Sequence, residues 1–186
     1  MHAVIKFKIT QMFRFSTLLW MFLLFGYPLF SLGQTTEALD QKFGFQNFKF
    51  NTPLSSYNSY NPVKIEEGRY KLTNIKTVKI GNWEVESIEL FFKSDNLVKI
   101  IVKVDDTERQ KNESIYNALL KNYGRYTYHR SSSGYSYTSE MIWKGKLVNL
   151  VYSFSSYREG DIFKSKITLI YSYLGETVEV DLTKDL

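Results

Sequence analysis

Apolar residues recur at every second position over several stretches of this chain, which predicts β-strands. Residues 43–50 read FGFQNFKF and predict a half-buried strand with a bulge at the central QN pair. Residues 83–92 and 97–104 alternate again, and the KSDN of residues 93–96 between them is typical of a turn. Such short connections require the neighbouring strands to be antiparallel.

The two strands within residues 83–104 predict one buried and one solvated face. Glu84, Glu86 and Glu89 are expected on the solvated face, where Lys99 and Lys103 of the next strand oppose them. Exposed pairs of this kind contribute a few tenths of a kcal/mol each, so they set register more than stability. The buried face is predicted to hold Ile88, Leu90, Phe92, Val98, Ile100, Val102 and Val104.

Alternation returns in the last third of the chain. The stretches YTSEMIW, LVNLVYSF and FKSKITLIYSY predict three further strands, separated by the turn KGK and by a polar loop, SSYREGD. A final TVEVDL at residues 177–182 is interpreted as an edge strand or an ordered tail. The inner faces are expected to hold Leu150, Tyr152, Phe154, Ile167, Leu169, Tyr171 and Tyr173.

Helical spacing replaces alternation in DDTERQKNESIYNALLKNYG. Thr107 and Gln110 have capping-box spacing, and Gly124 is a typical C-terminal stop. One apolar stripe predicts an amphipathic helix that packs on one sheet face. The stripe consists of Ile115, Tyr116, Leu119, Leu120 and Tyr123.

A second, much shorter helical signal lies near the start. Thr52 and Pro53 combine a capping residue with proline at the first helical position, and predict a single turn through Tyr57. The following NSYNPVKIEEGRY is interpreted as a loop. The pattern therefore predicts an α+β fold: a mainly antiparallel sheet of about six to seven strands packed by one amphipathic helix, plus a short N-terminal helical turn.

Residues 1–33 are interpreted as a signal peptide. Three basic residues without an acid precede the apolar run LLWMFLLFGYPLF, and the small residues Ser31 and Gly33 fit cleavage before Gln34. The alternative is an uncleaved anchor, because the run approaches the shorter end of a spanning helix. Residues 34–186 are expected to form a single exported domain, periplasmic or at the cell surface.

Composition excludes several classes of function. The chain has no cysteine, which removes disulfides, thiolate nucleophiles and Cys-ligated metals. Its net charge is +5, but Lys6, Lys8 and Arg14 of the targeting segment account for three of those charges. The remaining basic residues are scattered among acids, so no nucleic-acid-binding face is expected.

Catalytic chemistry finds few candidates. His129 is the one histidine after the targeting segment and has no nucleophile elbow beside it, so no catalytic residue is assigned. No phosphate-binding glycine loop, calcium loop or zinc ligand set occurs, so no cofactor or metal is expected. A pair of carboxylates that meet only in space would leave open a hydrolase acting on envelope polymers.

Aromatic residues are the compositional excess. The stretch YGRYTYHRSSSGYSYTS, residues 123–139, holds five of the 14 tyrosines. It is interpreted as an aromatic hairpin in which Tyr126 and Tyr128 face Tyr135 and Tyr137. Tyrosine combines apolar area with a polar group, so such residues are common at contact surfaces. The candidate partner-binding residues are Tyr126, Tyr128, His129, Arg130, Tyr135 and Tyr137.

The stretches FKFNTPLSSY, IELFFKSDNLVKIIV and IYNALLKNYG make the chain resemble small exported bacterial envelope proteins of unknown function. A more distant likeness is to a tandem sheet-and-helix inhibitor fold. Trp83 and Trp143 carry it, because apolar residues follow both at the same offsets, as in a duplicated unit. The resemblance implies an α+β export product without known catalytic residues. The leading hypothesis is a non-enzymatic domain that binds a protein or glycan; a purely structural component is not separated from it.

Overall fold

The computed structural model describes residues 37–105 and 109–175. The signal peptide, Thr107 of the capping box and the TVEVDL segment lie outside the described residues, so these expectations remain predictions. Within the described part, no helix is long and apolar enough to cross a membrane.

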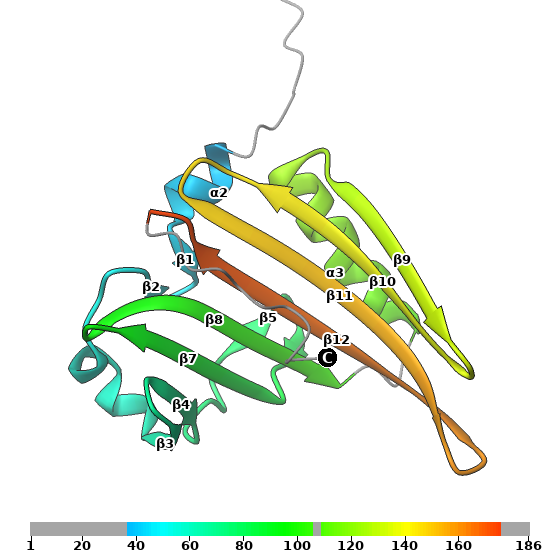
Figure 1. The fold of residues 1–186 in the computed structure, drawn as a ribbon, viewed down its shortest axis with the longest axis horizontal. Helices are drawn as coiled ribbons and strands as arrows, with labels where there is room; N and C mark the ends of the chain where they lie inside the picture. Colours follow the sequence, from blue (N-terminus) through cyan, green and yellow to red (C-terminus); the bar gives the residue numbers. More distant parts are fainter. Residues whose placement is uncertain (1–36, 106–108, 176–186) are drawn as a thin grey trace, which may run out of the picture. The chain divides into compact units, whose positions relative to one another are not determined.

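One antiparallel sheet of eight strands dominates the fold (Figure 1). Its strands lie in the order β3-β4-β7-β8-β12-β11-β10-β9, so β3 and β9 form the edges. The two longest strands, β11 and β12, pair over twelve residues each. The strands are β3 (Pro62–Glu66), β4 (Arg69–Leu72), β7 (Ser87–Lys93), β8 (Asn96–Asp105), β9 (Thr127–Ser133), β10 (Ser136–Lys144), β11 (Val148–Glu159) and β12 (Ile162–Tyr173).

Four short strands and three helices complete the described chain. Two hairpins of two-residue strands lie outside the main sheet, β1 with β2 and β5 with β6. Three helices accompany them, of which η1 is a 3-10 helix. Their bounds are α2 (Glu37–Lys42), β1 (Gly44–Phe45), β2 (Phe48–Lys49), η1 (Leu54–Tyr60), β5 (Lys79–Ile80), β6 (Trp83–Glu84) and α3 (Arg109–Tyr123).

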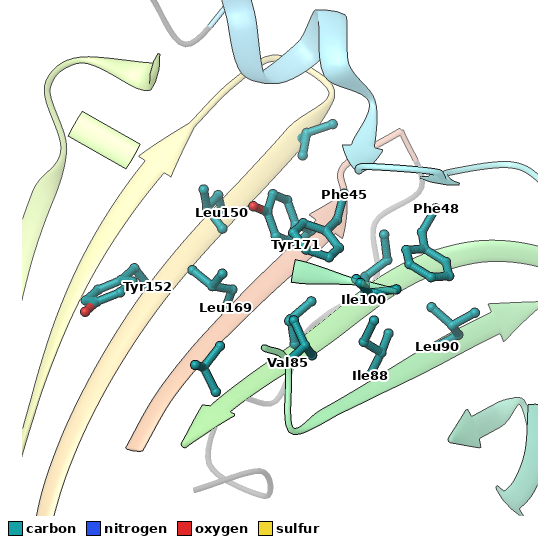
Figure 2. Close-up of a cluster of buried hydrophobic side chains, with 14 of the residues drawn as sticks. Phe45, Phe48, Val85, Ile88, Leu90, Ile100, Leu150, Tyr152, Leu169 and Tyr171 are labelled. Carbon is teal, nitrogen blue, oxygen red and sulfur yellow. The ribbon is translucent and has the colours of Figure 1, made fainter. Parts of the chain in front are cut away.

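The main core lies on one face of the sheet, which we call the inner face. Leu90, Ile100 and Leu150 of three different strands are fully buried there. The N-terminal elements pack on this face, and Phe45 of β1 contacts Tyr171 of β12 with ring centroids 5.5 Å apart (Figure 2). A smaller apolar cluster of Ile101, Val151 and Ile170 occupies the opposite, outer face.

Helix α3 confirms the predicted amphipathic helix. Ile115, Leu119 and Tyr123 are buried in the main core, and Tyr116 is partly buried. Leu120 is exposed, so the buried stripe is narrower than predicted. Gly124 ends the helix as expected, with φ +70° and its N–H donating to the Leu120 carbonyl.

The sheet is larger than the six to seven strands that the sequence predicts. The segment interpreted as a loop, residues 58–70, contains strand β3 and the start of β4, and this hairpin turns at Gly68 with φ +70°. Proline is tolerated in β3 because an edge strand can leave one side of its backbone unpaired. Edge position and mixed polarity therefore concealed this hairpin from pattern analysis.

Other corrections concern the N-terminal elements. Residues 43–50 form the hairpin β1–β2 and not one bulged strand, because Gln46 takes a left-handed conformation with φ +50°. The predicted helical turn is present as η1, but it has no side-chain cap. The Thr52 hydroxyl instead lies 3.5 Å from the Phe50 carbonyl oxygen.

The predicted solvated face of β7 and β8 is also corrected. Glu89 is only 6% exposed and lies between Arg69 and Lys103. The pairing of β7 with β8 shifts register between Phe91 and Phe92 of β7. Leu97 of β8 is therefore buried in the core, whereas Val98, which was predicted to be buried, is partly exposed. The bulge interrupts the period of two, so the alternation cannot be extended through it.

Asp40 of α2 joins the N-terminal helix to the β10–β11 turn. Its carboxylate accepts hydrogen bonds from the backbone N–H groups of Lys146, Leu147 and Val148, at 2.7, 2.9 and 2.9 Å. A Cβ atom on Gly145 would overlap this carboxylate, so glycine permits the approach. The interaction fixes α2 over one end of the sheet.

The order of elements repeats along the chain. A helical segment precedes four strands of the main sheet twice: η1 before β3, β4, β7 and β8, and α3 before β9 to β12. The two tryptophans differ in their surroundings, because Trp83 lies in the small β5–β6 hairpin and Trp143 is fully buried in β10. Duplication therefore stays a prediction, now with a topological basis in place of the tryptophan spacing.

Candidate binding surface

Two neighbouring hairpins, β9–β10 and β11–β12, extend past α3 at one end of the sheet (Figure 1). Large aromatic side chains remain exposed there and along the edge strand β9. At the hairpin ends Tyr135 is 76%, Phe163 68% and Tyr137 36% exposed, and Tyr128, near the start of β9, is 50% exposed. Exposed large aromatics gathered with arginine are typical of contact surfaces. We call this set the tip surface, and its members are Tyr128, Arg130, Tyr135, Tyr137, Arg158 and Phe163.

Sheet register explains why these side chains lie together. Successive side chains alternate between faces, so Tyr128, opposite the inner-face Met141, and Arg130, opposite Ser139, project from the inner face. Phe163, opposite Arg158, belongs to the same face of the next hairpin. The tip surface therefore continues the inner face beyond the part that helices cover.

Arginines lie against the rings of the tip surface. The guanidinium of Arg130 is 5.4 Å from the ring centroid of Tyr137, whose ring in turn lies 5.8 Å from that of Phe154. Between the hairpins, the Arg158 guanidinium is 5.6 Å from the Tyr135 ring. Each cation–π contact contributes about 0.5–1 kcal/mol at an exposed site. These contacts order the rings without burying them.

The structure places Tyr126, one of the predicted contact residues, partly buried against the main core. Its ring packs 5.3 Å from that of the buried Trp143, and its hydroxyl lies 3.0 Å from the Tyr116 hydroxyl of α3. That hydrogen bond raises the pKa of Tyr116. Tyr126 thus fixes the start of β9 to the helix and is a packing residue.

His129 is exposed but lies on the outer face, opposite Glu140 of β10. Its neighbours in β9, Tyr128 and Arg130, project from the inner face. The six predicted residues are therefore divided: four belong to the tip surface, Tyr126 packs against the core, and His129 lies on the other side of the sheet.

The aromatic hairpin itself is present, but its predicted pairing is wrong. Tyr128 lies opposite Met141, and Tyr137 lies opposite Ser132. The turn uses Gly134 with φ +56° followed by Tyr135, as in a two-residue hairpin. This turn sets the register, so Tyr128 and Tyr137 share one face but lie two levels apart, with the Arg130–Ser139 pair between them.

Sequence analysis missed Arg158 and Phe163. The segment interpreted as a polar loop continues both strands almost to Gly160, and Ile162 follows at 64% exposed. One signal was available: Ile162 and Phe163 are adjacent large apolar residues at a strand start, and adjacent residues point to opposite faces. Because only one of the two faces can pack on the core, at least one of these two side chains must lie outside it.

Two described carboxylates outside the tip surface, Glu89 and Glu67, have a lowered pKa. Burial alone would raise the pKa of Glu89, but hydrogen bonds from Lys103 and Arg69 outweigh it and lower that pKa. A pocket of about 310 Å³ at the far end of the sheet is lined by Glu67 and Asp95. The hydrogen bond from Lys64 lowers the pKa of Glu67, whereas a general acid requires a raised one.

In that pocket the Asp95 carboxylate accepts a hydrogen bond from the Leu54 backbone N–H, at 3.2 Å. The group therefore holds η1 in place. Over residues 37–105 and 109–175, no three histidine or acidic side chains gather in a way that could hold a metal ion. Within the described part of the chain, the tip surface is the site that has the composition of a contact region.

No family model, curated protein or solved structure matches this chain. The geometry of the tip surface is therefore the basis for assigning a function.

Proposed function

We propose that this protein is an exported, non-catalytic domain that binds a protein or glycan of the cell envelope through the tip surface. The observation that carries the proposal is the group of exposed aromatic rings against which Arg130 and Arg158 lie. Keeping large apolar rings in water opposes solubility unless they serve a contact. Tyrosine and arginine are also the residue types that dominate binding energy at interfaces.

The fold separates the residues that stabilise it from the residues of the tip surface. The buried core lies under the helices, whereas residues of the tip surface contribute little to it. Substitutions at the tip should therefore leave the fold intact, as a contact surface requires. Export remains part of the proposal, based on the charge and apolar pattern of residues 1–33.

The test combines Tyr128→Ser, Tyr135→Ser and Tyr137→Ser in the full chain expressed in its host cells. Partners are captured by cross-linking and identified by mass spectrometry. We expect the triple variant to lose a partner that the wild type captures, because three ring contacts are removed. Tyr126 is left unchanged because it supports β9.

The matched control carries Val63→Ser and Ile65→Ser, which remove exposed apolar side chains from the opposite edge of the sheet. It should capture the partner as the wild type does. The control should unfold within about 0.5 kcal/mol of the wild type, as expected of surface substitutions. The triple variant should lose no more than about 1–2 kcal/mol, because it removes the two cation–π contacts of Tyr135 and Tyr137. Undiminished capture by the triple variant would refute the tip surface as the binding site.

A further inference from the structure

Strand β9 forms an exposed edge of the main sheet beside the tip surface. Among the described residues it pairs with β10 alone, over seven residues without a register shift. All seven residues, Thr127–Ser133, are exposed. One complete side of the β9 backbone is therefore accessible for pairing with another chain.

The other edge, β3, is protected against such pairing. It begins with Pro62, its register shifts between Lys64 and Glu66, and its side chains include both charges. Proline, bulges and charged residues are the features by which natural edge strands avoid pairing with other chains. The sequence of β9, TYHRSSS, contains Arg130 but no proline, lysine or acidic residue, and its pairing is regular. The contrast within one sheet indicates that β9 is kept open.

The hairpin geometry identifies the available backbone groups. Residues that close a two-residue turn, here Ser133 and Ser136, exchange ladder hydrogen bonds, and the pattern then alternates along the strand. The N–H groups of Tyr128, Arg130 and Ser132 accordingly point away from β10. An added strand would hydrogen-bond to these three residues, whose side chains belong to the inner face.

We propose that β9 accepts an extended, acidic segment of a partner polypeptide as a ninth strand of the sheet. This rests on the proposed function, because the added strand would lie beside the tip surface. Residues 125–139 include Arg125, His129 and Arg130 but no aspartate or glutamate. The nearest acid, Glu140, lies opposite His129 on the outer face, so an acidic strand is electrostatically complementary on the inner face beside Arg130. A glycan has no backbone ladder to offer, and a second β9 would oppose basic side chains to one another.

The test uses a labelled, end-blocked peptide of alternating valine and glutamate, with a valine–lysine peptide as its counterpart. Binding to the full chain is measured by fluorescence anisotropy. The acidic peptide should bind the wild type, and the basic peptide should not. Ser132→Pro removes an outward N–H without removing a bond to β10, and should weaken binding about tenfold or more. Ser132→Ala keeps that N–H and should bind as the wild type does.

Arg130→Glu is a second variant that does not depend on tolerance of proline. It should shift the preference from the acidic to the basic peptide. Equal binding to Ser132→Pro and wild type, or no binding of the acidic peptide, would overturn strand addition. Sedimentation of the wild type and of Ser132→Pro tests a further outcome. If the wild type is a dimer and the variant is a monomer, the strand added to β9 comes from a second copy of this chain. That result would also overturn the proposal of an acidic partner segment.

The capture experiment separates this inference from the proposed function. If Ser132→Pro captures the partner and the triple tyrosine variant does not, the tip surface binds without strand addition. If the triple tyrosine variant captures the partner, the proposed function fails whatever the peptides do.

Discussion

Aromatic residues lie at both ends of the inner face of the sheet, but they are buried at one end and exposed at the other. Tyr152 and Tyr171 lie where helices and the N-terminal segment cover the sheet, and both are almost completely buried. Tyr135 and Tyr137 lie beyond that cover and are 76% and 36% exposed. The residue type and the alternation of the strands are the same. Whether other elements pack over a tyrosine, and not its local sequence, decides whether that tyrosine belongs to the core.

The hydroxyl groups show the consequence of burial. In the covered region Tyr57 donates to the Lys49 carbonyl at 2.9 Å and accepts from the Lys49 N–H at 3.0 Å. Burial also raises the pKa of Tyr171 well above its ordinary value, because a charged phenolate would be desolvated. At the bare end the rings instead contact Arg130 and Arg158. Tyrosine thus supports packing at one end and remains available for contact at the other.

The largest expected effect is at the covered end. Trp143 is fully buried, and its indole N–H donates to the Gly124 carbonyl at 3.0 Å. Trp143→Ala should lower the free energy of unfolding by about 3–5 kcal/mol, because it leaves a cavity. Urea denaturation measures the change. Trp143→Phe, which keeps most of the ring volume, should lose clearly less; equal losses would mean that packing is not the cause.

Asp40 gives the next largest effect, because three backbone N–H groups depend on its carboxylate. Asp40→Ala should lower the free energy of unfolding by about 2 kcal/mol. Asp40→Asn keeps one carbonyl acceptor and should cost about half as much in the same measurement. An unchanged Asp40→Ala variant would show that α2 is not held over the covered end.

Glu89 links stability to pH through Arg69 and Lys103. Its pKa is lowered on folding from an ordinary 4.5, so its contribution is complete above that value and is lost as pH falls through the folded pKa. Glu89→Gln should destabilise by about 1–2 kcal/mol at neutral pH, since both cations are partly exposed. Its stability should converge with that of the wild type in acid. Denaturation curves at several pH values test this, and a constant difference would contradict the linkage.

The smallest effect belongs to the bare end. Phe163→Ser should change the free energy of unfolding by less than about 0.5 kcal/mol, because the ring is 68% exposed. Glu66→Gln is a matched polar control, because Glu66 is an exposed partner of Arg69. It should change the free energy of unfolding by an equally small amount. A loss above about 2 kcal/mol for Phe163→Ser would show that the tip surface is structural.

Local patterns predicted much of the fold. The alternation in β8, β11 and β12 and the stripe of α3 are strong because each element packs one face on the main core. The hairpin β3–β4 was missed because an exposed edge strand such as Val63–Ile65 needs no apolar face. Burial of Glu89 was missed because it depends on Arg69, a residue 20 positions away.

The candidate site was predictable in part for a related reason. Tyr128, Arg130, Tyr135 and Tyr137 lie within ten positions of the sequence, so composition alone drew attention to them. Phe163 joins them only through the pairing of whole hairpins. The same tertiary dependence explains Tyr126, whose position under α3 follows from where the helix ends.

Tyrosine nitration of the full chain, read residue by residue by mass spectrometry, tests the comparison most directly. Tyr135 and Tyr128 should react first, because their side chains are 76% and 50% exposed. Tyr152 and Tyr171 should stay unmodified until the protein unfolds, since burial excludes the reagent and the raised pKa of Tyr171 disfavours its reactive phenolate. Modification of Tyr152 or Tyr171 as fast as Tyr135 in the folded protein would contradict the account.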